Sequence, residues 1–507
     1  LEAFDPAGFP ITWTELDAAH DIEFAQGEKA AQLHVGRDRN VMCGGFVTCG
    51  DPAAMLADAA VTVEGRFQSG FVEHAYIEPE AGFAQLVDGR VEVHACTQAP
   101  VMDLEGLEII LGIDRSQIRI VPTAVGGGFG SKLDISVQPY LALGALKTGK
   151  PVRLCFSRSE SMQSSTKRHP SDITLKIGAD KHGKLHGFDF KGDFDTGAYA
   201  SWGPTVANRV PVHASGPYAI ADYRAESKGI HTNNPPAGAF RGFGVPQSAI
   251  AQECLFDELA AKLAMDPLDF RILNALENGT ATVCGQVFRQ GVGIKACLEA
   301  LRPAWNSERA NADAFNQTSG VRRRGVGLAA GWYGCGNTSL PNPSTIKSGI
   351  RADGQVVLHQ GAMDIGQGAN TVVTQIFATA LGLPVQDIAI VGADTDVTPD
   401  AGKTSASRQT FVSGNAARLS GAALRTRVLE KLNAGPDATL SIEGSQIVAT
   451  DGGRRHRLDV SSLPCDAGGF VLRAEESYDP PTKPLDENGQ GAPYAQFGYA
   501  AQLVVVE

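Results

Sequence analysis

Three glycine-rich segments combine bare backbone with side chains that can bind an anion or stack on a planar ring. They are Gly126-Gly127-Gly128-Phe129-Gly130-Ser131-Lys132, Ala239-Phe240-Arg241-Gly242-Phe243-Gly244 and Asp364-Ile365-Gly366-Gln367-Gly368. Glycine lets the main chain approach a ligand closely, and clustered N–H groups attract negative charge. The sequence therefore predicts a binding site for a large anionic ligand.

The second and third segments each lead into a predicted helix. Apolar residues recur at helical spacing over residues 247–264 and 369–382, and Asp266-Pro267 predicts the start of another helix. A helix N-terminus carries about half a positive charge and several unpaired N–H groups. Residues 242–244 and 366–368 are therefore candidate sites for phosphate or another anionic oxygen.

Strand-like and helix-like patterns alternate along the chain. Residues 61–65 and 91–95 read as strands and residues 102–111 as a helix, which predicts an α+β or mixed α/β fold. Residues 1–60, with turn signals such as Gly44-Gly45, are predicted to form an irregular lead-in. The sequence begins at Leu1 without an initiator methionine, and residues 499–507 look like an unfinished strand, so we expect more protein on both sides of this chain.

A domain boundary is expected in the polar stretch 278–325, where residues 306–320 are predicted to form a loop. This places one domain at 1–290 and a second at 291–507. No repeat of fixed period and no low-complexity tract interrupts either part.

The composition argues against a nucleic-acid or membrane protein. The chain has 507 residues, 43% hydrophobic content and a net charge of -12, so no basic field would attract a polyanion. No apolar run reaches the roughly 18 residues needed to span a bilayer. Nine cysteines without metal-ligand spacing indicate reduced thiols, no iron–sulfur or zinc site in this chain, and a cytoplasmic location by default.

The sequence contains parts of three familiar motifs but completes none of them. Ser131 precedes Lys132 where a P-loop needs glycine, and no distal acid completes a dinucleotide fingerprint, which counts against a nucleotide-binding hydrolase. The K-T-G at Lys147 precedes the S-x-x-K at Ser164, so the order expected of a penicillin-binding protein is wrong. His74 and Glu78 could form a metal or acid/base pair, although a structural hydrogen bond is the simpler interpretation.

Taken in order, four motifs resemble the molybdenum-binding part of the xanthine oxidase family. They are the three glycine-rich segments, the second extended by Val245-Pro246-Gln247, and Thr404-Ser405-Ala406-Ser407-Arg408. The resemblance runs from about residue 50 to the end. It implies a large molybdopterin-binding fold of two elongated subdomains with the cofactor between them.

The resemblance also implies the roles of individual residues. The metal takes no ligand from the protein, because the pterin dithiolene holds it. Gln98 and Arg241 would be the catalytic groups near the metal. The implied cofactor-binding residues are Gln98, Gly128, Phe129, Gly130, Arg241, Gly366, Gln367, Gly368, Ser405, Ala406, Ser407 and Arg408.

The implied reaction is hydroxylation of an aldehyde to a carboxylic acid with oxygen from water. The cofactor would be molybdopterin, as such or as its cytosine dinucleotide, and electrons would pass to iron–sulfur clusters, with FAD a further candidate, on partner chains or segments. The family carries its catalytic glutamate in a Gly-x-Gly-Glu motif, which is absent from these 507 residues. A second polypeptide or segment must supply that base, and we expect a dimer of the complete complex.

The substrate pocket leaves alternatives open. Leu133 stands where purine-oxidising relatives carry an acid, which favours an apolar aldehyde or aromatic compound, whereas Arg209 matches a substrate-binding arginine of those relatives or simply bonds nearby backbone. Phe243 would form a pocket wall. A nicotinate or xanthine dehydrogenase is therefore the neighbouring hypothesis. A non-catalytic pterin-binding scaffold is another, and export to the periplasm with a partner is the alternative location.

Overall fold

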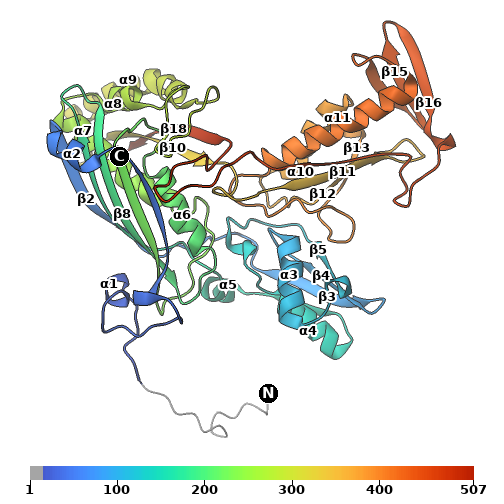
Figure 1. Cartoon of the computed structure of the whole chain (residues 1–507), viewed down its shortest axis with the longest axis horizontal. Coiled ribbons are helices and arrows are strands. Elements are labelled where there is room, and N and C mark those ends of the chain that lie inside the picture. Colours follow the sequence, from blue (N-terminus) through green and yellow to red (C-terminus); the bar gives the residue numbers. More distant parts are fainter. Residues whose placement is uncertain (1–14) are drawn as a thin grey trace.

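The computed structural model describes residues 15–507, which form three connected bodies (Figure 1). A large helix-covered sheet lies at the left of the view, a small sheet with two helices at the lower right, and a long arm at the upper right. Helices alternate with sheets that contain both parallel and antiparallel strand pairs. The predicted α+β class is confirmed.

The first body is built on a five-stranded sheet in the order β1-β9-β8-β7-β2. The strands are β1 (Val41–Cys49), β2 (Val61–Ser69), β7 (Ser171–Ala179), β8 (Leu185–Gly197) and β9 (Tyr223–His231). Only β8 and β9 are parallel. Helices α6 (Gly203–His213) and α7 (Val245–Lys262) pack on this sheet, and α7 confirms the helix predicted at 247–264.

Residues 15–60 are more regular than predicted. Strand β1 forms one edge of the large sheet, and α2 (Pro52–Asp58) follows it. Gly45 is not in a turn but within β1, where a Cβ atom would collide with the carbonyl oxygen of Ala207 in α6. The predicted irregular lead-in is wrong here because this glycine serves close packing, and residues 1–14 lie outside the described part of the chain.

The second body is a four-stranded sheet in the order β5-β4-β3-β6, covered by two helices. The strands are β3 (Ala81–Val87), β4 (Arg90–Ala95), β5 (Ile118–Pro122) and β6 (Val152–Cys155), and the helices are α3 (Pro100–Leu111) and α4 (Gln138–Thr148). The strand predicted at 91–95 and the helix predicted at 102–111 are confirmed. Leu107, Ile120 and Leu141 lie in its core.

Asp103 is a buried carboxyl group on α3. Asp103 is 2% exposed, and its Oδ2 accepts a hydrogen bond from Gln138 Nε2 at 3.0 Å. Burial raises the pKa of Asp103 from 3.8 to about 7, although hydrogen bonds from Thr97 and Gln138 oppose the shift. The pKa of Asp103 is higher in the folded protein than in the unfolded chain. The contribution of Asp103 to the free energy of unfolding is therefore smallest above pH 7, where the buried carboxyl group is charged.

We expect Asp103→Asn to stabilise the protein more at pH 8 than at pH 5. The wild type loses stability as the pH rises from 3.8 to about 7, whereas the neutral amide does not titrate. The gain should grow by about 2 kcal/mol between the two pH values. Urea unfolding curves of both proteins test this, and an equal difference at pH 5 and pH 8 would contradict it.

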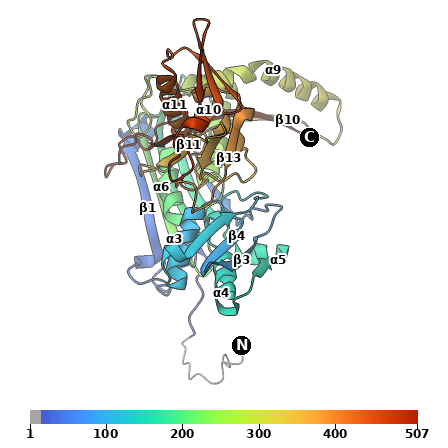
Figure 2. The ribbon, with the colours of Figure 1, turned by 90° about the vertical axis from the view of Figure 1, so that its right-hand side faces the viewer.

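The arm contains a four-stranded sheet in the order β13-β12-β11-β17. Its elements are β11 (Ser344–Ile350), β12 (Val356–Gln360), β13 (Ile388–Val391), β17 (Leu472–Tyr478), α10 (Ala369–Leu381) and α11 (Val412–Leu432), with β14 (Thr439–Glu443), β15 (Gln446–Asp451) and β16 (Arg454–Asp459) forming a separate sheet. Helix α10 ends at left-handed Gly382, as predicted. Figure 2 shows the arm above the small sheet of the second body.

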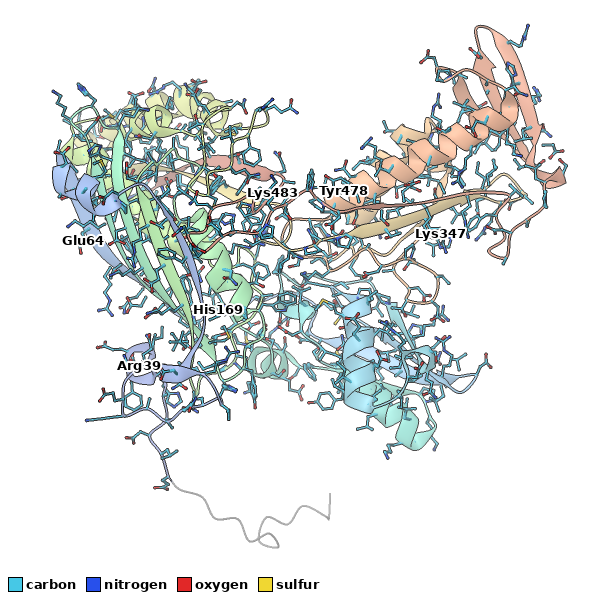
Figure 3. All side chains as sticks on the ribbon, in the orientation of Figure 1. Arg39, Glu64, His169, Lys347, Tyr478 and Lys483 are labelled. Atoms are coloured by element: carbon cyan, nitrogen blue, oxygen red, sulfur yellow. The ribbon has the colours of Figure 1, made fainter. Side chains whose placement is uncertain are left out.

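The chain then returns to the first body. Figure 3 labels Tyr478 and Lys483 on the segment that runs back from the arm. There β18 (Phe497–Val506) pairs with β10 (Gly325–Gly334) along ten residues, which confirms the strand predicted near 499–507. The two strands contribute Trp332 and other side chains to the core under the large sheet.

Helix α9 (Ile294–Thr318) occupies much of the segment predicted as loop. It buries Ile294, Leu298, Trp305 and Ala312, whose spacings of four and seven residues place them on one helix face. The remaining positions are mostly polar because they face water. The loop prediction is wrong because this apolar stripe is narrow and its polar surroundings hide it.

Short elements complete the described chain. They are α1 (Ile22–Ala25), α5 (Arg158–Ser164) and α8 (Pro267–Asn274), with 3₁₀ turns at Asp38–Asn40, Arg115–Gln117, Ser131–Leu133, Val385–Asp387 and Val460–Ser462. Asp266 caps α8, as predicted. Within residues 15–507, no helix is both long and apolar enough to cross a membrane.

Candidate cofactor-binding site

A cavity of about 830 Å³ is lined by segments of all three bodies. Parts of every predicted motif reach it, including the loop before α11. The lining residues are Ala75, Tyr76, Ile77, Gln98, Val125, Gly126, Gly127, Phe129, Gly130, Arg241, Gly242, Phe243, Tyr333, Ile365, Gly366, Gln367, Thr404, Ser405, Ala406, Ser407, Arg408, Gln409 and Thr410. Residues separated by more than 300 positions therefore share one site.

The first and second glycine-rich segments touch each other. Gly130 has a φ of +119°, and a Cβ atom there would collide with the carbonyl oxygen of Ala239. The Arg241 N–H donates a hydrogen bond to the Phe129 carbonyl oxygen at 2.9 Å. Only glycine combines this backbone conformation with so close an approach. The contact forms one wall of the cavity.

Gln98 connects the first segment to the loop before α11. Its Oε1 accepts a hydrogen bond from the Gly130 N–H at 3.0 Å, and its Nε2 donates to the Thr404 carbonyl oxygen at 2.7 Å. The Thr404 N–H also donates to the Gln98 carbonyl oxygen at 2.9 Å. An amide nitrogen has a second hydrogen, so Gln98 can still donate one bond to a ligand in the cavity.

We expect Gln98→Glu to reduce the cofactor content of the purified complex by about tenfold or more. A carboxylate oxygen would replace the donor that faces Thr404 and add negative charge beside an anionic ligand. Gln117→Glu, on an exposed 3₁₀ turn, makes the same chemical change as a control. The measurement is metal and pterin per chain, and full cofactor content in folded Gln98→Glu would contradict the expectation.

Lys132 anchors the glycine-rich loop and does not line the cavity. It is 2% exposed, and its Nζ donates to Glu78 Oε2 at 2.7 Å. The same oxygen accepts from the Gly126 N–H at 2.7 Å, so the lysine and the glutamate clamp the start of the loop. His74 instead bonds the Ala239 carbonyl oxygen through Nε2, and the hypothetical His74–Glu78 pair does not form.

Asp364 lies five residues before the first residue of α10 and binds the main chain that leads into this helix. Its Oδ1 accepts hydrogen bonds from the N–H groups of Gly366 and Gly368, and its Oδ2 accepts from Asn370. The chain's own carboxylate thus takes N–H groups that the sequence suggested for an external anion. No role was predicted for Asp364, yet an Asp two residues before Gly-x-Gly is a recognisable capping signal.

Arg408 is a buried structural residue as well as part of the lining. Its Nε donates to Asn342 Oδ1 at 2.8 Å, its Nη2 to the Pro343 carbonyl oxygen at 2.6 Å, and its Nη1 to the Ala401 carbonyl oxygen. Burial lowers the pKa of Arg408 to about 10. By contrast, Ser405 Oγ is buried without a hydrogen-bond partner among the described residues.

The other predicted site residues divide into two groups. Arg241 and Phe243 line the cavity, whereas Gly128, Gly368, Leu133 and Arg209 do not. The Arg241 guanidinium is exposed and forms no ion pair or hydrogen bond with another described residue. Leu133 is 3% exposed in the core of the first body, and Arg209 is fully buried behind the lining.

Backbone strain is concentrated around the cavity. Twelve non-glycine residues of the described chain have positive φ, and five of them line the site: Ala75, Phe129, Phe243, Ala406 and Ser407. Such conformations cost about 1–3 kcal/mol each and cluster where a ligand is bound. This distribution indicates that the cavity is a functional site.

The lining fits a molybdopterin better than a directly bound metal ion. None of the described residues that line the cavity is Asp, Glu, His or Cys, so a metal there must bring its own ligands. A Cβ atom at Gly128 would collide with Gln98 Oε1, so glycine at this position lets the loop pack closely against Gln98. Arg241 offers free donors to an anionic group, and Ser405 a free hydroxyl.

Two family models, each described as a molybdopterin cofactor-binding domain, match the chain. They cover residues 33–275 and residues 299–507. The fold and the site thus define a molybdopterin-binding protein.

Curated relatives narrow this class to one family. The chain is 39% identical over 302 residues to the nicotinate dehydrogenase large molybdopterin subunit of Eubacterium barkeri, covering 59% of this chain and 70% of that subunit. It is 33% identical over 427 residues to the xanthine dehydrogenase molybdenum-binding subunit of Escherichia coli O157:H7, covering 83% and 56%. The chain belongs to the xanthine oxidase family of molybdenum hydroxylases, as the sequence motifs predicted.

Solved structures confirm the molybdopterin-binding fold. The aldehyde oxidoreductase of Desulfovibrio desulfuricans superposes with a TM-score of 0.85 at 27% identity, covering 97% of this chain and 52% of that one. Among the curated relatives, the aldehyde oxidoreductase of Megalodesulfovibrio gigas is 31% identical over 409 residues, covering 80% of this chain and 45% of that protein. Apart from the nicotinate dehydrogenase subunit, the chain spans about half the length of these relatives.

Proposed function

We propose that the chain is the molybdenum-cofactor-binding component of an oxidoreductase that hydroxylates an aldehyde to a carboxylic acid with oxygen from water. The observation that carries this proposal is the convergence of four separate motifs on one cavity that lacks acids and metal ligands. The similarity of this chain to two aldehyde oxidoreductases supports an aldehyde as the substrate.

A molybdopterin bound in this cavity supplies the metal and the two-electron chemistry. The proposed cradle is the main chain at Gly128, Phe129 and Gly130, where a Cβ atom on either glycine would collide with the protein. Gln98 and Arg241 provide donors beside the metal, and Phe243 provides an apolar wall for the substrate. The remaining contacts fall to the turn 366–368 and to residues 405–408.

The proposal requires other polypeptides or segments. No Gly-x-Gly-Glu motif is present, so the base that removes a proton from the attacking water comes from elsewhere. Iron–sulfur clusters, with or without FAD, take up the electrons on partner chains or segments. The remaining proposals are a cytosine dinucleotide form of the cofactor, two domains divided at residue 290, a dimer of the complete complex and a cytoplasmic location, with the periplasm as the alternative.

Metal and pterin analysis of the complex from its native host tests this proposal. We expect about one molybdenum and one pterin per chain, because the cavity holds a single cofactor of this size. The complex should oxidise benzaldehyde with an artificial electron acceptor. Properly matured complex without molybdenum and pterin would overturn the proposal.

A heteroaromatic hydroxylase is the second candidate function. The similarity to a nicotinate dehydrogenase subunit favours it, and turnover of a pyridine ring but not of an aldehyde would establish it. A non-catalytic scaffold predicts a complex that holds the cofactor, lacks any chain with Gly-x-Gly-Glu and turns over neither compound class.

A further inference from the structure

Tyr333 presents an unused hydroxyl group at the cavity. It lies in β10 and lines the cavity together with Phe243. Its buried hydroxyl group donates no hydrogen bond to any described residue, and the Arg209 side chain beside it can only donate. Because a buried hydroxyl proton without an acceptor is unfavourable, this group points to a ligand that accepts from it.

A buried positive charge lies directly behind this tyrosine. Arg209 is fully buried, and its Cζ lies 4.8 Å from the centroid of the Tyr333 ring. Its Nη2 donates to the Gly336 carbonyl oxygen at 2.7 Å, but its Nε has no partner. No carboxylate of the described residues forms an ion pair with Arg209, so its charge is balanced only by carbonyl dipoles and aromatic rings.

The field around this corner of the cavity is positive. Burial, together with the charges of Arg408 and Arg209, lowers the pKa of Lys403 to about 8, although Asp400 acts in the opposite direction. Burial raises the pKa of Tyr333, while the charge and the side-chain N–H donors of Arg209 act in the opposite direction. A phenol beside a guanidinium in a low-dielectric site is a strengthened hydrogen-bond donor, and it prefers a negatively charged acceptor.

We propose that Tyr333 determines substrate specificity by donating a hydrogen bond to a carboxylate on a planar aromatic substrate. This inference rests on the proposed function, since it assigns the substrate class of the same cavity. Phe243 offers the apolar face for the ring, and Arg209 acts through Tyr333 as a positioning residue that supplies the positive potential. An uncharged acceptor would leave the Arg209 charge uncompensated, which is why the carboxylate is favoured.

The test compares two substrates of similar size on the purified complex. 4-Formylbenzoate carries the carboxylate, and 4-methylbenzaldehyde replaces it with a methyl group. We expect the wild type to prefer the carboxylate compound, and Tyr333→Phe to lower kcat/KM for it by about 10- to 100-fold, the range of a hydrogen bond to a charged group. The same variant should change kcat/KM for 4-methylbenzaldehyde by less than about threefold.

Tyr494→Phe is the matched control. Tyr494 also stacks near Arg209, at 5.2 Å, but its hydroxyl bonds Thr338 and it does not line the cavity. It should leave the preference between the two substrates unchanged. If Tyr333→Phe affects both substrates equally, or if the wild type shows no preference for the carboxylate, the inference is wrong.

A binding measurement separates this inference from the proposed function. The Kd of benzoate for the wild-type complex and for Tyr333→Phe can be measured by calorimetry without turnover. If neither aldehyde is oxidised but benzoate binds at least about tenfold more weakly to Tyr333→Phe, the proposed function fails and the carboxylate site stands. Equal benzoate affinity overturns the carboxylate site whatever the activity.

Discussion

The Gly130→Ala variant is expected to lose the cofactor almost completely, to below about a tenth of the wild-type content. A methyl group at this position would collide with the Ala239 carbonyl oxygen, and the φ of +119° is unfavourable for alanine. The loop must therefore move away from residues 239–241, which breaks the bonds from Gly130 to Gln98 and from Arg241 to Phe129. Molybdenum and pterin per chain measure the loss.

The Gly89→Ala variant is a control that introduces backbone strain without a steric clash. Gly89 also has a positive φ, +80°, but a Cβ atom there would meet nothing within 4 Å. This control should lose about 1–2 kcal/mol of stability from backbone strain and keep its cofactor. Equal cofactor content in the two variants would show that the contact between the glycine segments does not shape the site.

The Glu253→Gln variant is expected to lower the free energy of unfolding by about 3–5 kcal/mol. Arg271 is fully buried, and its Nε donates to Glu253 Oε2 at 2.7 Å. The other oxygen, Oε1, accepts from the Tyr218 hydroxyl at 2.9 Å, and Oε2 also accepts from the Ala330 N–H at 3.2 Å. The amide nitrogen of the glutamine would face another donor. The guanidinium charge of Arg271 would then be compensated only by the half-exposed carboxylate of Asp257, which Nη1 contacts at 2.7 Å.

Glu258→Gln is the control on the same helix, because Glu258 is exposed and forms no ion pair with a described residue. It should change stability by less than about 0.5 kcal/mol. Urea unfolding at pH 7 measures both variants. A similar loss in the two would mean that the network among α7, α8 and β10 contributes little to stability.

Local signals predicted the fold wherever structure depends on nearby residues. Helix α10 follows from its apolar spacing and from Gly382, and α8 follows from Asp266. The strand at β18 follows from its run of apolar residues. In each case the residues that define the element lie within a few positions of one another.

Long-range contacts explain the errors. Gly45 reads as a turn residue until α6 is placed against β1, and α9 reads as a loop until β10 and β18 cover its narrow apolar stripe. In both cases the reason for the local structure is a contact with a helix or strand that lies elsewhere in the sequence. A single sequence does not reveal which glycine bends the backbone and which one makes room for a neighbour.

The site shows the same division. The glycine-rich motifs identified the cavity lining, because close backbone approach restricts the residue type. The sequence did not show that Gln98 bridges to Thr404 or that Tyr333 stands in front of Arg209. Both relationships join parts of the chain that only the fold brings together.

The hydrogen bonds of Gln98 to Gly130 and Thr404 also bear on the biosynthesis of the holoenzyme. A nascent chain that has emerged only as far as residue 300 has two glycine-rich segments but lacks the opposite side of their cavity. The complete lining of the cavity is therefore present only after the chain has been translated to residue 410 and the arm has folded against the other two bodies.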